Sequence, residues 1–162
     1  MWDKCAPYYE KITGHVIMTE DIAFSTVLFY FAQSVATVPN DAYFYRANEN
    51  ASTNADRLPF VKFQKNMKDI QTVFDFVEDF LKDVNADLWI CKDFKEFRKY
   101  YARMWRHLPN EIYVGSEKVQ GLKIMRQFCP EEDRGKLSED IYVSFDIFDV
   151  LFVLAMDMGK LL

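Results

Sequence analysis

The chain has 162 residues, of which 50% are hydrophobic and 17% aromatic, and its net charge is −5. This composition excludes an intrinsically disordered or collagen-like chain, because there are enough apolar residues to build a hydrophobic core. The five glycines stand alone at positions 14, 115, 121, 135 and 159, so the sequence contains no glycine-rich phosphate-binding loop. We expect a single, mainly α-helical domain over residues 1–162, folded as a compact bundle of about five helices.

We expect residues 1–18 to be irregular or to form one short helix. A longer helix is predicted after them. Thr19 followed by two acids is typical of a helix start, which predicts a helix from about 20 to 37. Residues 22–38 carry no charge and are the only candidate membrane span. Their polar side chains and acidic flanks argue against a span, so we expect a central helix of the bundle.

Three further segments have weaker signals. Residues 48–59 contain three asparagines with neighbouring Ser and Thr, which makes them the clearest loop and the one candidate internal boundary. A short extended segment is an option at 42–45, and another at 140–147, where apolar and polar residues alternate. The length of the apolar run over 138–158 favours a helix instead, and both readings of that segment stay open.

Two amphipathic helices have the most regular patterns. Between Phe63 and Val84, apolar residues recur every three or four positions, which predicts a helix with one buried face. Asp93 and Glu96 have the spacing of a capping box and predict a second helix over 93–108, and Ser116 is expected to cap a further one that ends before Pro130. The expected apolar stripe of the second helix consists of Phe94, Phe97, Tyr101, Met104, Trp105 and Leu108.

Residues suited to catalysis or metal binding are few. The two histidines and three cysteines lack the close pairs that zinc sites use, and no catalytic motif is present, so we expect no metal and no cofactor. The odd, dispersed cysteines and an N-terminus without signal-peptide features favour an intracellular, most plainly cytoplasmic, protein. Asp146, Asp149 and Asp157 would be candidate general acids or bases if buried, or else a solvated stripe of the last helix.

Charge is divided along the chain. Residues 1–91 carry −5, residues 92–126 carry +5 and residues 127–162 carry −5. Lys95, Lys99, Arg103 and Arg106 fall on one face of the expected helix over 93–108, opposite its apolar stripe, with Arg98 at the edge. We call these four residues the basic face.

Three interpretations of the basic face remain open. Its residues could be solvated and pair with the protein's own acids at 69–83 or 131–133. They could dock a protein with an acidic surface, or they could bind an anionic ligand such as nucleic acid, phosphate or a lipid headgroup. The overall acidity of the chain argues against nucleic acid.

Aromatic residues are concentrated between positions 24 and 45. Tyr30, Tyr43, Phe44 and Tyr45 form a second, weaker candidate surface for a partner, since tyrosine is favoured at interfaces, although ordinary core packing is the simpler explanation. Together these patterns predict a non-enzymatic intracellular protein that binds another protein, as an adaptor, an inhibitor or antagonist, or an accessory subunit. An oligomer is left open. The alternative is a binder of an anionic ligand through residues 92–126, and the third hypothesis is a small enzyme that uses the C-terminal aspartates.

Overall fold

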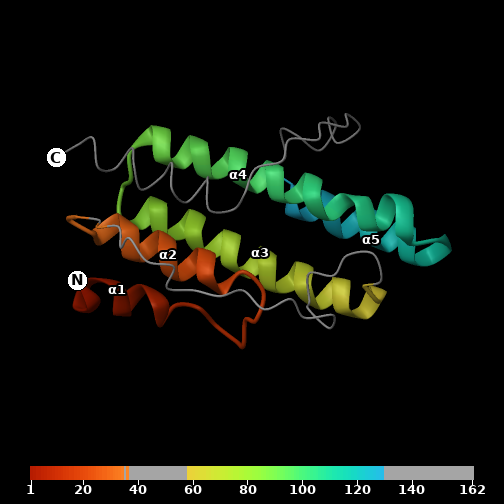
Figure 1. Cartoon of the computed structure of the whole chain (residues 1–162), viewed down its shortest axis with the longest axis horizontal. Helices are drawn as coiled ribbons and strands as arrows, with labels where there is room; N and C mark the ends of the chain where they lie inside the picture. The colour runs from red at the N-terminus through yellow and green to blue at the C-terminus, as the bar shows by residue number, and fades with distance from the viewer. Residues whose placement is uncertain (35, 37–57, 130–162) are drawn as a thin grey trace.

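The computed structural model describes residues 1–34, 36 and 58–129 (Figure 1). These ranges contain no strand but five α-helices and one π-helical turn: α1 (Trp2–Tyr9), α2 (Glu20–Phe31), α3 (Phe60–Asp83), α4 (Leu88–His107), η2 (Leu108–Ile112) and α5 (Gly115–Phe128). The predicted helical bundle is thus confirmed. The expectations for residues 42–45, 138–158 and 140–147, and most of the candidate boundary at 48–59, lie outside the described residues.

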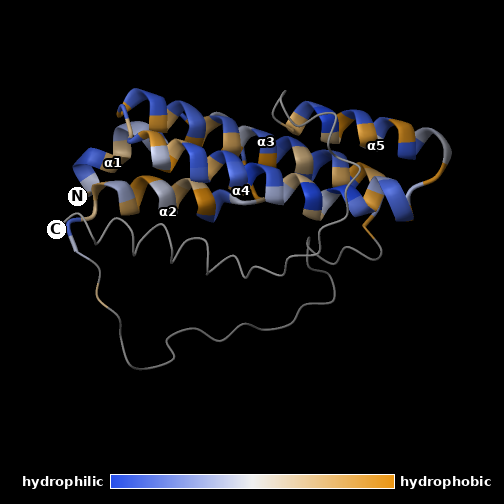
Figure 2. Ribbon diagram, turned by 90° about the horizontal axis from the view of Figure 1, so that it is seen from above, coloured by the Kyte–Doolittle hydropathy of each residue, from blue (hydrophilic) through white to orange (hydrophobic). Residues whose placement is uncertain are grey.

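The central helix of the bundle is α3 (Figure 1). Helices α2, α4 and α5 each pack against it, and α1 packs against α2. Hydrophilic and hydrophobic residues alternate along the helix ribbons in Figure 2, as amphipathic helices require. The apolar face predicted from the periodicity of α3 is buried: Phe63, Met67, Ile70, Val73, Phe74, Val77, Phe80 and Leu81.

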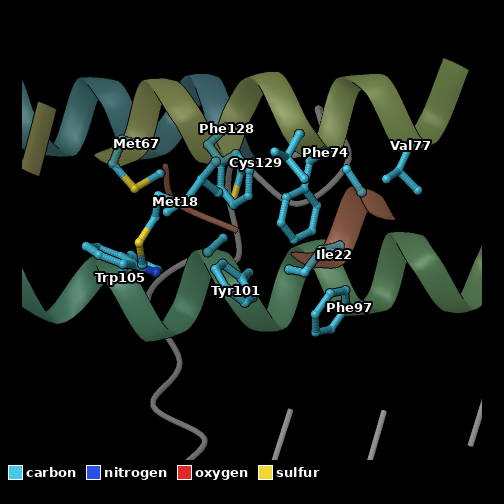
Figure 3. Close-up of a cluster of buried hydrophobic side chains, with 14 of the residues drawn as sticks. Met18, Ile22, Met67, Phe74, Val77, Phe97, Tyr101, Trp105, Phe128 and Cys129 are labelled. Carbon is cyan, nitrogen blue, oxygen red and sulfur yellow. The ribbon is translucent and has the colours of Figure 1, made fainter. Parts of the chain in front are cut away.

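An aromatic cluster around Phe74 joins α3 to two other helices. The Phe74 ring is fully buried and points from α3 towards α4 (Figure 3). Ring centroids lie between 5.2 and 5.6 Å from that of Phe74 for four neighbours, which are Phe94, Phe97, Tyr101 and Phe128. Because these rings come from α4 and α5, burial of one side chain stabilises the packing of three helices.

Two predicted features of α2 differ in the structure. The helix ends at Phe31 rather than near 37, because Ala32 has an extended backbone (φ −70°, ψ 132°). Its buried residues are Ile22, Ala23 and Val27, so burial stabilises the N-terminal two-thirds of the helix. Thr19 is the N-cap residue, as predicted, but its hydroxyl donates to the Met18 carbonyl instead of capping the helix.

Two predicted caps are wrong. α4 begins at Leu88 with Asp87 as N-cap, so the expected capping box of Asp93 and Glu96 lies inside the helix. The chain reverses at Asn85, whose positive φ of 51° follows the end of the preceding helix, and α4 begins directly after this turn. α5 begins at Gly115, which places Ser116 within the helix rather than at its cap.

Gly121 allows α5 to pack closely against η2. A Cβ atom at this buried position would lie 2.7 Å from Cβ of Pro109 and 3.7 Å from the Phe60 ring. A larger side chain would force α5 away from both neighbours, since real Cβ contacts are not this short. Glycine at 121 therefore sets how near α5 approaches the rest of the bundle.

Tyr113 connects the segment before α5 to the start of α3. Its hydroxyl donates to the Leu58 carbonyl at 2.9 Å, and its ring meets the Phe60 ring edge-on with 5.2 Å between centroids. Burial raises the pKa of Tyr113 to about 12, and burial also raises the pKa of Tyr101. Both phenols are therefore held in the neutral form by the fold.

We expect Phe74→Ala to lower the free energy of unfolding by about 3–5 kcal/mol, because it leaves a cavity among four rings. Val61→Ala, at a side chain that is 77% exposed, is the matched control and should change it by less than about 0.5 kcal/mol. Urea unfolding followed by circular dichroism measures both. Equal effects of the two substitutions would contradict the central position of Phe74.

The contribution of Tyr113 to stability should be constant up to about pH 10 and be lost between about pH 10 and about pH 12. The sign follows from the raised pKa: unfolded tyrosines lose their protons near pH 10, whereas Tyr113 in the folded state keeps its proton to about pH 12. In Tyr113→Phe the fall in stability over this range should be shallower, as measured by the urea midpoint against pH. A fall as steep as that of the parent would rule out ionisation of Tyr113 as a cause.

Candidate functional site

The four residues of the basic face differ in exposure on α4. Lys95 and Arg103 are exposed and Arg106 is half-buried. The Lys99 side chain is only 17% exposed, and its Nζ lies 2.8 Å from Oε1 of Glu96. The accessible part of the basic face therefore consists of Lys95, Arg103 and Arg106.

Arg98, expected at the edge of the basic face, is instead 6% exposed and binds two other helices. Its Nε donates to the Phe128 carbonyl at 2.9 Å, and its Nη1 donates to Asp75 at 3.0 Å and to Glu78 at 2.8 Å. The guanidinium also lies 5.0 Å from the centroid of the Phe128 ring. Arg98 thus joins α4 to α3 and to the C-terminal end of α5.

The interpretation that the basic segment pairs with acids at 69–83 holds for Arg98. Lys95, Arg103 and Arg106 form no ion pair with any residue in the described ranges, and residues 131–133 lie outside them. The acids of the C-terminal half of α3 have internal partners, because Asp79 binds Lys82 and Asp83 binds Lys11. Positive charge on α4 is therefore left exposed, while these acids of α3 are paired within the fold.

Apolar surface adjoins the basic face. Met104, predicted to be part of the buried stripe of α4, is 42% exposed, because Tyr101 and Trp105 occupy the face that meets the core and Met104 falls at its edge. Half-buried Tyr100 lies one turn before it on the same side of the helix. Around the helix axis Tyr100 and Met104 lie next to Arg103, whereas Lys95 lies on the opposite side from Met104. One flank of α4 thus combines a cation with an apolar patch, as protein interfaces do.

The weaker aromatic candidate is only partly covered by the structure. Tyr30 is half-buried, and its ring meets those of Phe31 and Phe80 edge-on at 5.3 and 5.4 Å. Its hydroxyl donates to the Val84 carbonyl at 3.4 Å, and burial raises its pKa. Tyr30 therefore contributes to the packing of α2 on α3. Tyr43, Phe44 and Tyr45 lie outside the described residues, so that surface stays a prediction.

An exposed aromatic cluster at the N-terminus was missed by the sequence analysis. Trp2 is 63% and Phe24 46% exposed, and the Tyr9 ring lies between them, with centroid distances of 5.8 Å to Trp2 and 4.5 Å to Phe24. The seven-residue spacing of Trp2 and Tyr9 places both on one side of α1. That spacing was a usable signal, but it required residues 1–18 to be assigned as a helix.

A groove of about 350 Å³ lies between the end of α1 and the C-terminal half of α3. Nζ of Lys11 lies 2.6 Å from Oδ2 of Asp83 and 5.0 Å from the centroid of the Tyr8 ring. Since 72 residues separate Lys11 from Asp83, no local sequence pattern indicated this pairing. The groove residues are Tyr8, Lys11, Ile12, Thr13, Thr72, Asp75, Phe76, Asp79, Phe80 and Asp83.

Other candidate chemistry is limited in the part of the chain that is described. There, no three His, Cys, Asp or Glu residues gather as a metal site would require. No helix among the same residues combines the length and apolar character needed to cross a membrane. Asp146, Asp149 and Asp157 fall outside the described ranges, so the enzyme hypothesis built on them stays untested.

Comparison of the chain with protein-family models, with curated proteins and with solved structures finds no match.

We expect Arg98→Ala to lower the free energy of unfolding by about 2–4 kcal/mol, because it leaves the Phe128 carbonyl and two carboxylates without their shared donor. Arg103→Ala, on the exposed side of the same helix, should change it by less than about 0.5 kcal/mol. Urea unfolding of both variants makes the comparison. If Arg103→Ala lowered the free energy of unfolding as much as Arg98→Ala does, the buried contacts of Arg98 would not be what distinguishes the two arginines.

Proposed function

We propose that this protein is a non-enzymatic intracellular protein that works by binding another protein. The partner binds with an acidic surface to the outer side of α4. The contacts on α4 are Lys95, Arg103 and Arg106, with Lys99 between them. Such a protein acts as an adaptor, as an inhibitor or antagonist, or as an accessory subunit of a larger assembly.

The observation that carries this proposal is the charge of exposed Lys95 and Arg103 and half-buried Arg106, which form no ion pair within the described part of the chain. Long cationic side chains on a well-packed helix favour fast, selective association with a surface of opposite charge. The rigidity of α4 is supported by the buried contacts of Arg98 and by its ring contacts with Phe74. The partner would therefore meet a preformed surface rather than order one on binding.

The apolar patch beside Arg103 supports a protein as the partner. Exposed Met104 and half-buried Tyr100 supply area that a partner side chain can cover. Methionine adapts its shape to different partners, and tyrosine offers a ring with a polar tip. A site that recognised only charge would not need this apolar surface.

An anionic ligand such as nucleic acid, phosphate or a lipid headgroup is the second candidate. Lys123 and Arg126 of α5 are also exposed, so positive charge extends beyond α4 along residues 92–126. Binding of that kind is dominated by contacts with phosphates and weakens steeply with salt. The net charge of −5 disfavours it.

The double reversal Lys95→Glu/Arg103→Glu should abolish partner binding and leave the fold intact, because both side chains are exposed and form no described ion pair. The matched control is Lys4→Glu/Lys62→Glu, which changes the net charge equally but lies on α1 and at the start of α3. Each tagged variant is used for affinity capture from the native cell at near-physiological salt, followed by mass spectrometry and by binding measurements with the purified partner.

The proposal is supported if the parent and the control both capture the same protein, and if the double reversal binds that protein at least about tenfold more weakly. The proposal fails if the parent captures nothing, or if both variants bind the partner equally. Retention of the parent on nucleic acid or anionic vesicles at the same salt, lost in the double reversal, would favour the second candidate instead.

A further inference from the structure

The outer side of α3 carries a regular stripe that the proposed function does not use. The residues of this stripe alternate between four and three positions apart along α3. With this spacing they stay on one side of the helix, where a partner helix could lie along its whole length. All are exposed except Thr72, which is half-buried. We call this the α3 stripe: Val61, Lys65, Lys68, Thr72, Asp75, Asp79 and Lys82.

Charge along α3 runs against the preference of a helix. Acids stabilise the N-terminal turns and bases the C-terminal turns, because the helix dipole is positive at its start. α3 has no acid in its first turn, and its first half holds lysines 62, 65 and 68 with one acid, Asp69. Its second half holds four acids, Asp75, Glu78, Asp79 and Asp83, with one base, Lys82, in the last turn. The stability of α3 itself does not account for this order.

The α3 stripe is complementary to itself when reversed. If two copies lie antiparallel with Thr72 at the centre, Lys68 faces Asp75 of the other copy and Lys65 faces its Asp79, and symmetry forms each pair twice. A parallel arrangement would instead place like charges opposite each other. From this complementarity we infer that a second copy of this chain docks antiparallel along α3 as a symmetric dimer.

The side chains that would form these pairs can accept a new partner. Lys65 and Lys68 make no ion pair within the described ranges. Within the same ranges, the ion pair of Asp79 is with Lys82, three residues further along the exposed surface of α3. The Asp79 side chain is 73% exposed. Asp75 already accepts from Arg98 and from Gln71, whose Nε2 lies 2.7 Å from both carboxylate oxygens, but its side chain is 51% exposed and a carboxylate has further lone pairs.

The groove beside α3 adds apolar contact to these charge pairs. Asp75 and Asp79 line it, together with the apolar side chains of Tyr8, Ile12 and Phe76. Lysine stems lie well along such surfaces while the ammonium group reaches a carboxylate. Lys11 already shows this arrangement within one copy, because its ammonium lies between the Tyr8 ring and Asp83. In the dimer, Lys65 and Lys68 of the second copy would extend the same row of cations.

The test is the association constant of the full chain by sedimentation equilibrium at about 50 mM and about 500 mM salt. We expect a reversible monomer–dimer equilibrium at low salt that shifts to monomer at high salt, because exposed pairs are screened. Lys65→Asp and Asp79→Lys should each weaken the dimer by about tenfold or more. The combined Lys65→Asp/Asp79→Lys restores complementarity and should return the constant to within about threefold of the parent.

Two controls locate the interface. Lys95→Asp on α4 should leave self-association unchanged, since that residue lies outside the α3 stripe. Thr72→Cys should form a disulfide between copies on mild oxidation, because position 72 meets itself at the centre of the dimer, whereas Gln64→Cys, on α3 but far from the centre, should not.

A monomer at low salt up to the solubility limit would overturn the inference, and so would a combined variant that fails to recover. Self-association that responds to Lys95→Asp and not to Lys65→Asp would also overturn it, since the interface would then lie on α4. The first two results leave capture of a different protein by α4 unaffected, because the α3 variants and the α4 variants change different helices.

Discussion

Burial of the apolar face of α3 around Phe74 is the constraint on which the rest of the fold depends. α3 has 24 residues and spans about 36 Å, and α2, α4 and α5 all pack on it. Because one face must be buried along that whole length, the rotation of α3 about its axis is fixed. That rotation decides which acids point towards α1, which point towards Arg98, and which side remains exposed.

Electrostatics then divides the basic residues of α4 into two kinds. A buried charge needs partners, and Arg98 has three of them from two other helices. Arg103, five residues further along the helix, points outward and has no comparable contacts within the described ranges. Consecutive turns of one helix thus supply both a structural cation and cations available to a partner, and only their surroundings distinguish them.

The fold class and the faces of the two long helices could be predicted from the sequence, because hydrophobic periodicity reports burial directly. The start of α4 could not, because Asp93 and Glu96 match a capping box while the actual turn is set by the backbone at Asn85. The exposure of Met104 depends on which neighbouring residue takes the core position, which spacing alone does not resolve. Arg98 was placed at the edge of the basic face because sequence carries no sign that the Phe128 carbonyl faces it. Non-local contacts of that kind, including the one between Lys11 and Asp83, require the packed structure.

The close approach at Gly121 has a mechanical consequence for the other end of α5. Gly121 and Phe128 are seven residues apart, so about 10 Å of rigid helix separates the contact with Pro109 from the carbonyl that Arg98 binds. A tilt of α5 about its crossing point would carry that carbonyl away from the guanidinium in proportion to this length. Because Gly121 has no Cβ, α5 can pack closely at the crossing point, and this close packing fixes the tilt of the helix. The tilt in turn keeps the Phe128 carbonyl, two turns away, within hydrogen-bond distance of Arg98.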